Sequence, residues 1–287
     1  MSFFQPVEVI PPGVRQAEFR ARLPAWNLLL RGALSGAYIG MGACLMIFVT
    51  AGIEIPLGAG FTRFIAGSVF PLGIIISVLT GAELFAGDGM LTVMAAFGHK
   101  ISWFEVFRLW MLVWVGNMAG ALFYAALMAF GAYSLVGTAG STEITSVGVA
   151  AVSIAAVKCS SPGFYAGISL FAKAIICGWL VNIAVLLAIC ADDVIGKILG
   201  IWFLMMTMMA TGLEHAVTNM ALISSGLLAA SRLTPLQVAQ VGPDIANLGW
   251  IEMWTGNLIG ASLGNLLGGL LFAVLLYFTV VRKKKYN

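Results

Sequence analysis

Residues 212–220 read Gly212-Leu213-Glu214-His215-Ala216-Val217-Thr218-Asn219-Met220 and interrupt an apolar stretch that runs from about 196 to 230. Ionisable groups at membrane depth are rare and costly, so adjacent glutamate and histidine side chains there indicate function. Unwound backbone at that depth survives only where protein or a water-filled cavity satisfies its N–H and C=O groups. The stretch therefore predicts a broken helix beside a path through the membrane.

A second interruption opens in the same way. It reads Gly81-Ala82-Glu83-Leu84-Phe85-Ala86-Gly87-Asp88-Gly89-Met90, inside an apolar stretch at about 64–97. Both interruptions begin Gly-x-Glu, at an offset of 131 residues. Gly116-Asn117-Met118-Ala119-Gly120 is also echoed by Gly256-Asn257-Leu258-Ile259-Gly260. We interpret these matches as a duplication of three spans, and an odd number of crossings per half makes the repeat an inverted one.

The composition indicates that lipid rather than water surrounds most of the chain. Of the 287 residues, 61% are hydrophobic and 9% are charged, whereas a soluble domain is about 25% charged. Secreted, fibrous, disordered and nucleic-acid-binding classes are therefore excluded. A spanning helix needs about 20 mostly apolar residues, and four more stretches qualify, at roughly 27–51, 104–130, 165–190 and 250–281. We expect an all-α membrane protein with six transmembrane helices, of which the second and fifth are broken.

Basic residues orient this arrangement, because cytoplasmic loops carry an excess of lysine and arginine. Arginines precede the first span and a basic cluster follows the last, at Arg15, Arg20, Arg22 and Arg31 and at Arg282, Lys283, Lys284 and Lys285. Both termini are therefore expected in the cytoplasm of a multi-pass protein of the cell membrane. The expected parts are a cytoplasmic N-terminal arm at 1–26 with room for an interfacial helix, a transmembrane domain at 27–281 with repeat halves at about 27–130 and 165–281, and a basic cytoplasmic tail at 282–287.

Few residues are candidates for chemistry. His215 could exchange a proton near neutral pH or be a neutral histidine bonded inside the bundle. Glu83 and Glu214 are interpreted as scaffolds whose carboxylates accept backbone N–H groups freed by the breaks. Asp88 lies at the cytoplasmic end of its break or in the path. Lys158 is a surface lysine or a cation that concentrates anions.

Two further predictions concern Lys173 and enzyme chemistry. Lys173 is expected to snorkel outward from the fourth span. The sequence contains no Gly-x-Ser-x-Gly elbow, phosphate loop, His-Glu-x-x-His or His/Cys cluster, so neither an enzyme nor a cofactor or metal site is expected. The four cysteines show no disulfide framework.

These residues resemble the formate/nitrite transporter family of pentameric anion channels, over most of the chain. The resemblance is strongest at 212–220, which is similar to that family's Gly-aromatic-Glu-His-Ser-x-Ala-Asn-Met break. Gly81-Ala82-Glu83-Leu84-Phe85 and Ala37-Tyr38-Ile39-Gly40 resemble its second-span break and its first-span signature. The resemblance implies an aquaporin-like protomer, a homopentamer in the lipid bilayer, and a substrate pore through each protomer.

Carried over by position, the resemblance also implies roles for single residues. His215 would be the central pore histidine, Glu214 and Asn219 would support its break, and Lys158 would draw anions. Phe70 and Met208 would form an outer apolar constriction, and Ile74, Leu84 and Val181 an inner one. Phe85 would belong to the loop that gates the inner side.

The chain departs from the family pattern at two positions. Ala86 replaces a threonine able to hydrogen-bond the histidine, and Gly178 replaces a pore asparagine, for which Asn182 on the same helical face could substitute. The expected function is transport of formate linked to protons. Nitrite or hydrosulfide is the alternative substrate, and a non-conducting membrane anchor is the alternative function.

Overall fold

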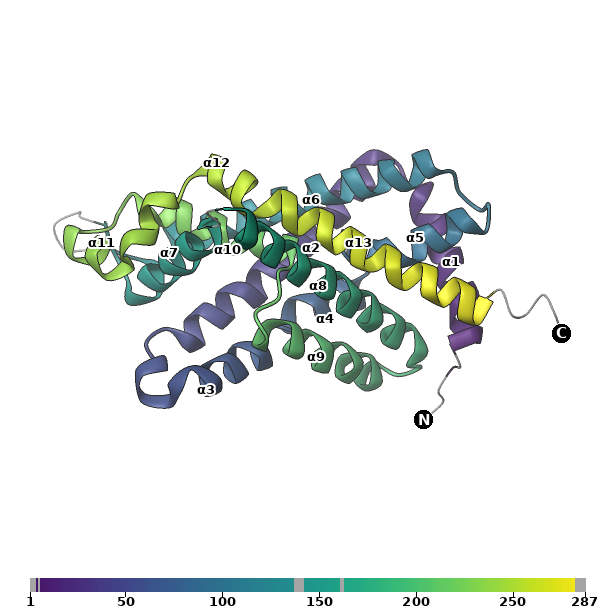
Figure 1. Ribbon diagram of the computed structural model, residues 1–287, viewed down its shortest axis with the longest axis horizontal. Coiled ribbons are helices and arrows are strands. Elements are labelled where there is room, and N and C mark those ends of the chain that lie inside the picture. Colours follow the sequence, from purple (N-terminus) through teal and green to yellow (C-terminus); the bar gives the residue numbers. More distant parts are fainter. Residues whose placement is uncertain (1–3, 5, 137–141, 161–162, 282–287) are drawn as a thin grey trace.

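A computed structural model of the chain describes residue 4 and residues 6–136, 142–160 and 163–281, and Figure 1 shows a bundle made mostly of long helices. The basic tail at 282–287 lies outside the described residues. The first half contains α1 (Pro6–Ala21), α2 (Ala25–Thr50), α3 (Glu54–Val69), α4 (Leu72–Thr80), α5 (Asp88–Phe97) and α6 (Trp103–Phe130). The second half contains α7 (Ser146–Cys159), α8 (Phe164–Cys190), α9 (Val194–Ala210), α10 (Ala216–Ala230), α11 (Pro235–Val241), the 3-10 turn η1 (Pro243–Asn247), α12 (Trp250–Met253), the π-helical turn η2 (Trp254–Leu258), α13 (Ile259–Leu276) and the π-helical turn η3 (Tyr277–Val281).

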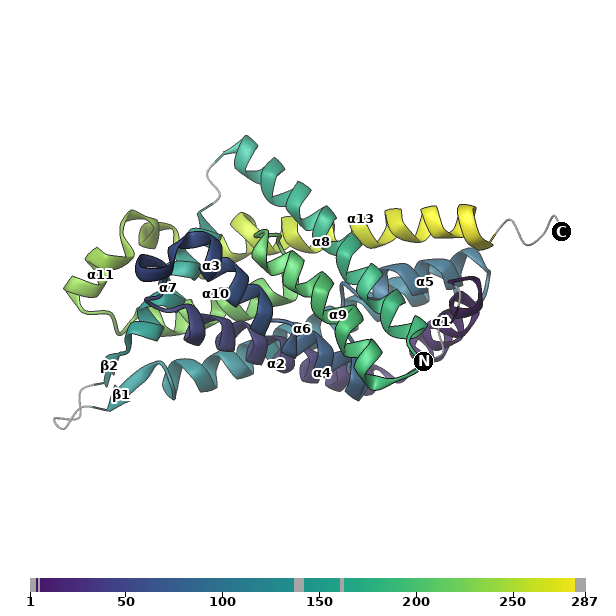
Figure 2. The ribbon, with the colours of Figure 1, turned by 90° about the horizontal axis from the view of Figure 1, so that it is seen from below.

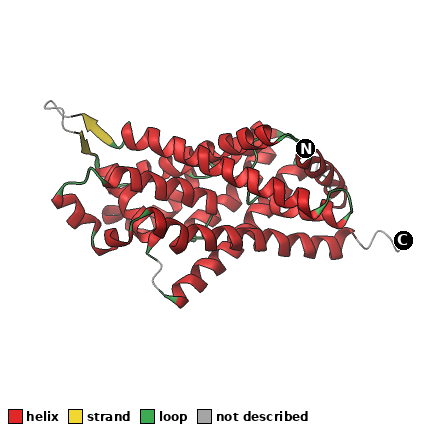
Figure 3. Ribbon diagram, turned by 90° about the horizontal axis from the view of Figure 1, so that it is seen from above, coloured by secondary structure: helices red, strands yellow, loops and turns green. Residues whose placement is uncertain are grey.

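One small strand pair accompanies the helices. β1 (Ser134–Val136) pairs antiparallel with β2 (Thr142–Ile144), with Ser134 opposite Ile144. Figure 3 shows this hairpin at one end of a molecule that is otherwise helical. The pair and the whole of α7 come from the stretch between the two predicted repeat halves.

Among the described residues, five apolar helical segments are long enough to cross a membrane: Ala25–Thr50, Pro56–Thr80, Trp103–Phe130, Phe164–Cys190 and Trp250–Val280. The fifth predicted stretch is instead two shorter apolar helices, α9 with 17 residues and α10 with 15. The second stretch was expected to begin near residue 64, but its helix begins at Glu54.

Glycine ends the helix before each break. Gly81 follows α4 with a φ of 73° and Gly212 follows α9 with a φ of 70°, a left-handed conformation that suits residues without a Cβ. Behind them, Ala82 N donates to Ser77 O at 2.9 Å and Leu213 N donates to Met208 O at 3.1 Å. The same helix stop therefore recurs at the offset of 131 residues, which explains why both interruptions begin with glycine.

Matched helix pairs hold the two breaks. α2 packs most extensively on α6, and α8 packs most extensively on α13. The helices approach closely because glycines stand at the contacts: Gly36 of α2 meets the backbone of Asn117, and Gly178 of α8 meets the backbone of Asn265. A close glycine contact therefore occurs in each of the two helix pairs.

α1 packs on the helical bundle. Val9, Ile10, Ala17 and Ala21 are buried in the main apolar core, and the helix contacts α5, α6 and α8. In Figures 1 and 2, α1 lies with the end of α13 at one end of the molecule, while α11 lies at the other end. The predicted N-terminal arm thus contains a helix that covers α5 and the first break.

Candidate functional site

Neighbouring groups hold the side chain of His215 in the second break. It is 1% exposed and forms the N-cap of α10. Its Nδ1 atom accepts the backbone N–H of Thr218 at 3.2 Å and lies 2.8 Å from the Thr218 hydroxyl oxygen. Because Nδ1 accepts a backbone N–H, the proton of the neutral ring is on Nε2. Nε2 is buried without a hydrogen-bond partner among the described residues.

Asparagines tie both breaks to a neighbouring helix pair. Asn265 of α13 accepts the Ala216 N–H at 2.9 Å and donates to the carbonyls of Glu214 and Ala174, each at 2.9 Å. An unpaired backbone group buried in an apolar setting costs about 1–3 kcal/mol. Asn265 therefore replaces the helical bonds that the second break removes.

Asn117 of α6 does the same for the first break. It accepts the Phe85 N–H at 3.0 Å and donates to the carbonyls of Glu83 and Gly32, each at 2.9 Å. Its structural counterpart is thus Asn265, in Gly264-Asn265-Leu266-Leu267-Gly268, rather than Asn257. The expected match of 116–120 with 256–260 was wrong because the Gly-Asn-x-x-Gly pattern occurs twice near the end of the chain, once across η2 and α13 and once within α13.

Two arginines meet the carboxylates of the first break. Arg20 of α1 contacts Glu83 at 3.1 Å and Asp88 at 3.2 Å, and Arg31 of α2 contacts Glu83 at 3.2 Å. Arg31 also donates to Gly81 O at 3.1 Å. The second carboxylate oxygen of Asp88 is buried without a partner in the described part of the chain. The expectation that Glu83 accepts backbone N–H groups is corrected, since its carboxylate binds arginines.

These four charges lie in a cavity of about 690 Å³ that we call the arginine pocket. Its lining includes Arg20, Arg31, Ile74, Glu83, Leu84 and Asp88. Two cations face two carboxylates, so the formal charges of this group balance. Asp88, left open by the sequence, therefore lies in the cavity wall beside the first break.

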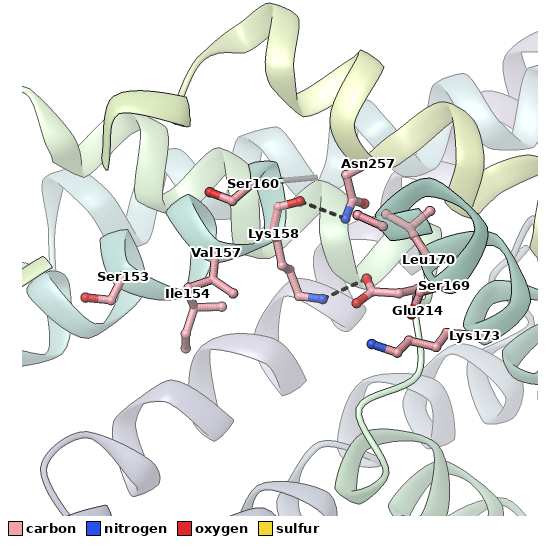
Figure 4. Close-up of a pocket in the computed structure, with 11 residues that line it drawn as sticks. Ser153, Ile154, Val157, Lys158, Ser160, Ser169, Leu170, Lys173, Glu214 and Asn257 are labelled. Carbon is pink, nitrogen blue, oxygen red and sulfur yellow. Dashed lines mark hydrogen bonds and ion pairs between the residues drawn. The ribbon is translucent and has the colours of Figure 1, made fainter. Parts of the chain in front are cut away.

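The second break borders a different cavity, of about 530 Å³, that we call the lysine pocket. Its lining includes Ile154, Val157, Lys158, Leu170, Lys173, Glu214 and Asn257. Figure 4 shows Lys158 entering from α7 to meet Glu214, and Lys173 extending into the pocket from α8. Lys173, which was expected to snorkel outward, has an exposed side chain that lines this pocket.

A short chain of polar contacts leads from Lys158 to α10. Lys158 Nζ lies 2.8 Å from Glu214, whose carboxylate also accepts the Asn219 amide at 2.6 Å. Asn219 donates as well to Asn257 at 2.7 Å, and Asn257 donates to Lys158 O at 3.1 Å. Glu214, like Glu83, binds side chains rather than the backbone N–H groups expected. Lys158, Glu214 and Asn219 are thus brought together next to His215.

The apolar constriction candidates are all buried: Phe70, Ile74, Leu84, Phe85, Val181 and Met208. Ile74 and Leu84 line the arginine pocket. Phe85 lines a separate apolar groove with Trp110 and Trp114 of α6. Met208 contacts Cys177 of α8 through sulfur atoms 3.3 Å apart.

Gly178 and Asn182 have different roles on α8. A Cβ atom at position 178 would lie 2.7 Å from Asn265 Cα, so this glycine is required for the contact with α13. Asn182 accepts the Met90 N–H at 3.0 Å and donates to Ala86 O at 2.8 Å. Its side chain therefore satisfies backbone groups at the end of the first break.

Several of these residues were not singled out from the sequence as site residues: Arg20, Arg31, Asn117, Thr218 and Asn265. Sequence spacing gives one signal for Thr218, which follows His215 by three residues and so reaches the helix N-cap. Arg20 and Glu83 are 63 residues apart, a separation that no local pattern connects.

The chain is similar to known transporters and channels. A family model described as formate/nitrite transporter matches residues 8–279. A "Probable formate transporter" of Methanothermobacter thermautotrophicus is 33% identical, covering 99% of both chains. The "Nitrite transporter NirC" of Salmonella typhimurium is 29% identical, covering 92% of this chain and 88% of its own. A solved "Pentameric formate channel with formate bound" has 27% identity and a TM-score of 0.77, covering 90% of this chain and 98% of that one. These relatives are transporters and channels, not enzymes.

Proposed function

The chain belongs to the formate/nitrite transporter family, and on that premise we propose that it carries formate across the cell membrane through a path that passes His215. The observation that carries this proposal is the position of His215. It is buried at the second break, next to Glu214 of the lysine pocket, and its Nε2 atom has no partner in the described part of the chain. An unpaired N–H in such a place is available to a passing acid or anion.

The proposed path runs from the lysine pocket to the arginine pocket. These cavities border the second and first breaks, and α7 and α1, which contribute to them, lie toward opposite ends of the molecule in Figure 1. We assign the lysine pocket to the outside and the arginine pocket, with both termini, to the cytoplasm. Phe70 and Met208 narrow the outer side of His215, and Ile74, Leu84 and Val181 narrow the inner side.

The transported species changes its charge along this path. An anion loses its hydration at an apolar constriction, which costs several kcal/mol, whereas a neutral acid does not carry that cost. A carboxylic acid as strong as that of aspartate is only about one part in a thousand neutral at pH 7. The anion is therefore gathered in the lysine pocket, protonated there or near His215, and passed through the constrictions as the neutral acid.

Nitrite or hydrosulfide is the second candidate substrate, and of these two the family description names nitrite. Polar contacts to His215 are fewer than the family pattern implies, since Ala86 brings no hydroxyl and position 178 is glycine. A non-conducting membrane anchor is the alternative outside transport.

The experiment is uptake into liposomes that contain the purified protein. Formate, nitrite and hydrosulfide are each presented at several external pH values, with protein-free liposomes as the control. Formate flux that rises as pH falls supports the proposal. Flux of another anion alone replaces the substrate, and no flux of any of the three favours the anchor.

A further inference from the structure

The charges of the lysine pocket do not cancel. Two lysines, Lys158 and Lys173, line it together with one carboxylate, Glu214. The arginine pocket, in contrast, pairs Arg20 and Arg31 with Glu83 and Asp88. The excess positive charge therefore belongs to the lysine pocket, and the ion pairs decide which residue carries it.

Lys158 is already compensated. Its ammonium group lies 2.8 Å from the Glu214 carboxylate, and both side chains are mostly buried, at 18% and 14% exposure. At a distance, such a pair acts as a dipole, whose attraction for an anion falls off faster than that of a single charge. An anion that binds Lys158 must also compete with a carboxylate that Asn219 holds at 2.6 Å.

Lys173 is not compensated. It has no ion pair or hydrogen bond among the described residues, and its side chain is exposed. It follows the first residue of α8, Phe164, by nine positions, which places it about 14 Å along the helix. A charged side chain so far into an apolar helix must face water or a charged partner. Figure 4 shows where it points, into the pocket beside Glu214.

We propose that Lys173 is the residue that draws the anion into the lysine pocket, while Lys158 is held by Glu214 and positions the second break. This assignment rests on the proposed function, because it concerns the capture of the transported anion. The single charge of Lys173 raises the local anion concentration above Glu214, next to which His215 lies. Lys173 acts on the encounter and not on the passage through the constrictions.

The test is initial formate uptake by liposomes at fixed pH and varied ionic strength, set with sodium gluconate. At low ionic strength, K173Q is expected to slow uptake roughly two- to fivefold, the effect of one unit charge about 10 Å away in a largely aqueous setting. In about 0.5 M salt, charges more than roughly 4 Å apart are screened, so K173Q and the wild type converge. K173R restores the salt dependence. The matched control is R63Q, which removes an exposed cation of α3 that does not line the pocket.

Each outcome decides the assignment. Convergence at high salt supports it, because a folding defect lowers the rate at every ionic strength. K173Q rates equal to the wild type at low salt, or lower by the same factor at all salt concentrations, overturn it while wild-type flux still supports the proposed function. Wild-type liposomes that take up no more formate than protein-free ones overturn the proposed function and this assignment together.

Discussion

The two nitrogens of the His215 ring have different surroundings. Nδ1 is used inside the protein, because it caps α10 through the Thr218 N–H at 3.2 Å and lies 2.8 Å from the Thr218 hydroxyl. Nε2 has no partner in the described part of the chain. The ring is thus fixed on one edge and available on the other.

Removal of the ring nitrogens tests the role of His215 in proton-linked passage. H215F keeps a ring of similar size and removes both ring nitrogens, including the unpartnered Nε2. Formate uptake by the variant is expected to lose or invert its rise at low pH, measured between about pH 5 and 8, where an unperturbed histidine titrates. The control is H99N at the other histidine, whose φ of 55° is one that asparagine tolerates. A pH profile unchanged by H215F would remove His215 from the mechanism.

Substitution of Thr218 tests whether its hydroxyl group positions the His215 ring. T218V keeps the shape of the side chain but removes a hydrogen bond worth about 1 kcal/mol. Formate uptake is expected to fall roughly fivefold, the factor that about 1 kcal/mol represents. T218S, which retains a hydroxyl, is expected to recover most of the rate. Equal rates for T218V and T218S would show that the hydroxyl is not the cause.

At the scale of elements, the breaks themselves follow from the sequence, while their partners do not. Gly81 and Gly212 mark the helix stops because glycine, without a Cβ, adopts a positive φ at no steric cost, and both have that conformation. The asparagines that replace the lost backbone bonds come from other helices. The sequence offered Asn257 and Asn265 in the same pattern, and only the packing of α8 on α13 selects Asn265.

The prediction made from local sequence was also wrong for the two glutamates, Glu83 and Glu214. Their repeat positions suggested backbone acceptors, but α1 and α7 bring cations to them, Arg20 to Glu83 and Lys158 to Glu214. Both cations lie more than fifty residues away from their partners along the chain. Such pairs depend on how helices cross, which helical periodicity does not encode.

The contact between α8 and α13 can be tested at Gly178. A Cβ atom there would lie 2.7 Å from Asn265 Cα, and overpacking of this kind costs typically about 1–3 kcal/mol. G178A is expected to lower the melting temperature in detergent. G167A is a matched control on the same helix, because a Cβ at Gly167 meets nothing within 4 Å. Equal melting temperatures for both variants would contradict the contact described.

At the scale of the whole molecule, much apolar surface remains uncovered by the single chain. Large exposed side chains occur on several helices, including Phe64 of α3, Phe123 of α6, Ile168 of α8 and Leu263 of α13. Lipid covers such surfaces, and so do neighbouring copies of a membrane protein.

Native mass spectrometry of the detergent-solubilised protein measures the number of copies. A complex of five 30.3 kDa chains is expected, because the similar solved channel is described as pentameric. Gel filtration with light scattering gives an independent mass. A stable monomer in several mild detergents would contradict the pentamer and leave the exposed faces to lipid.

The two breaks share a glycine stop, a glutamate and an asparagine tie, yet they differ at the residue that follows the glutamate. At the offset of 131 residues that relates Glu83 to Glu214, the position equivalent to His215 is Leu84. The first break therefore presents an apolar side chain where the second presents an imidazole. On the proposed path the two breaks are therefore not interchangeable, because only the second supplies a ring nitrogen able to exchange a hydrogen bond with a permeating molecule.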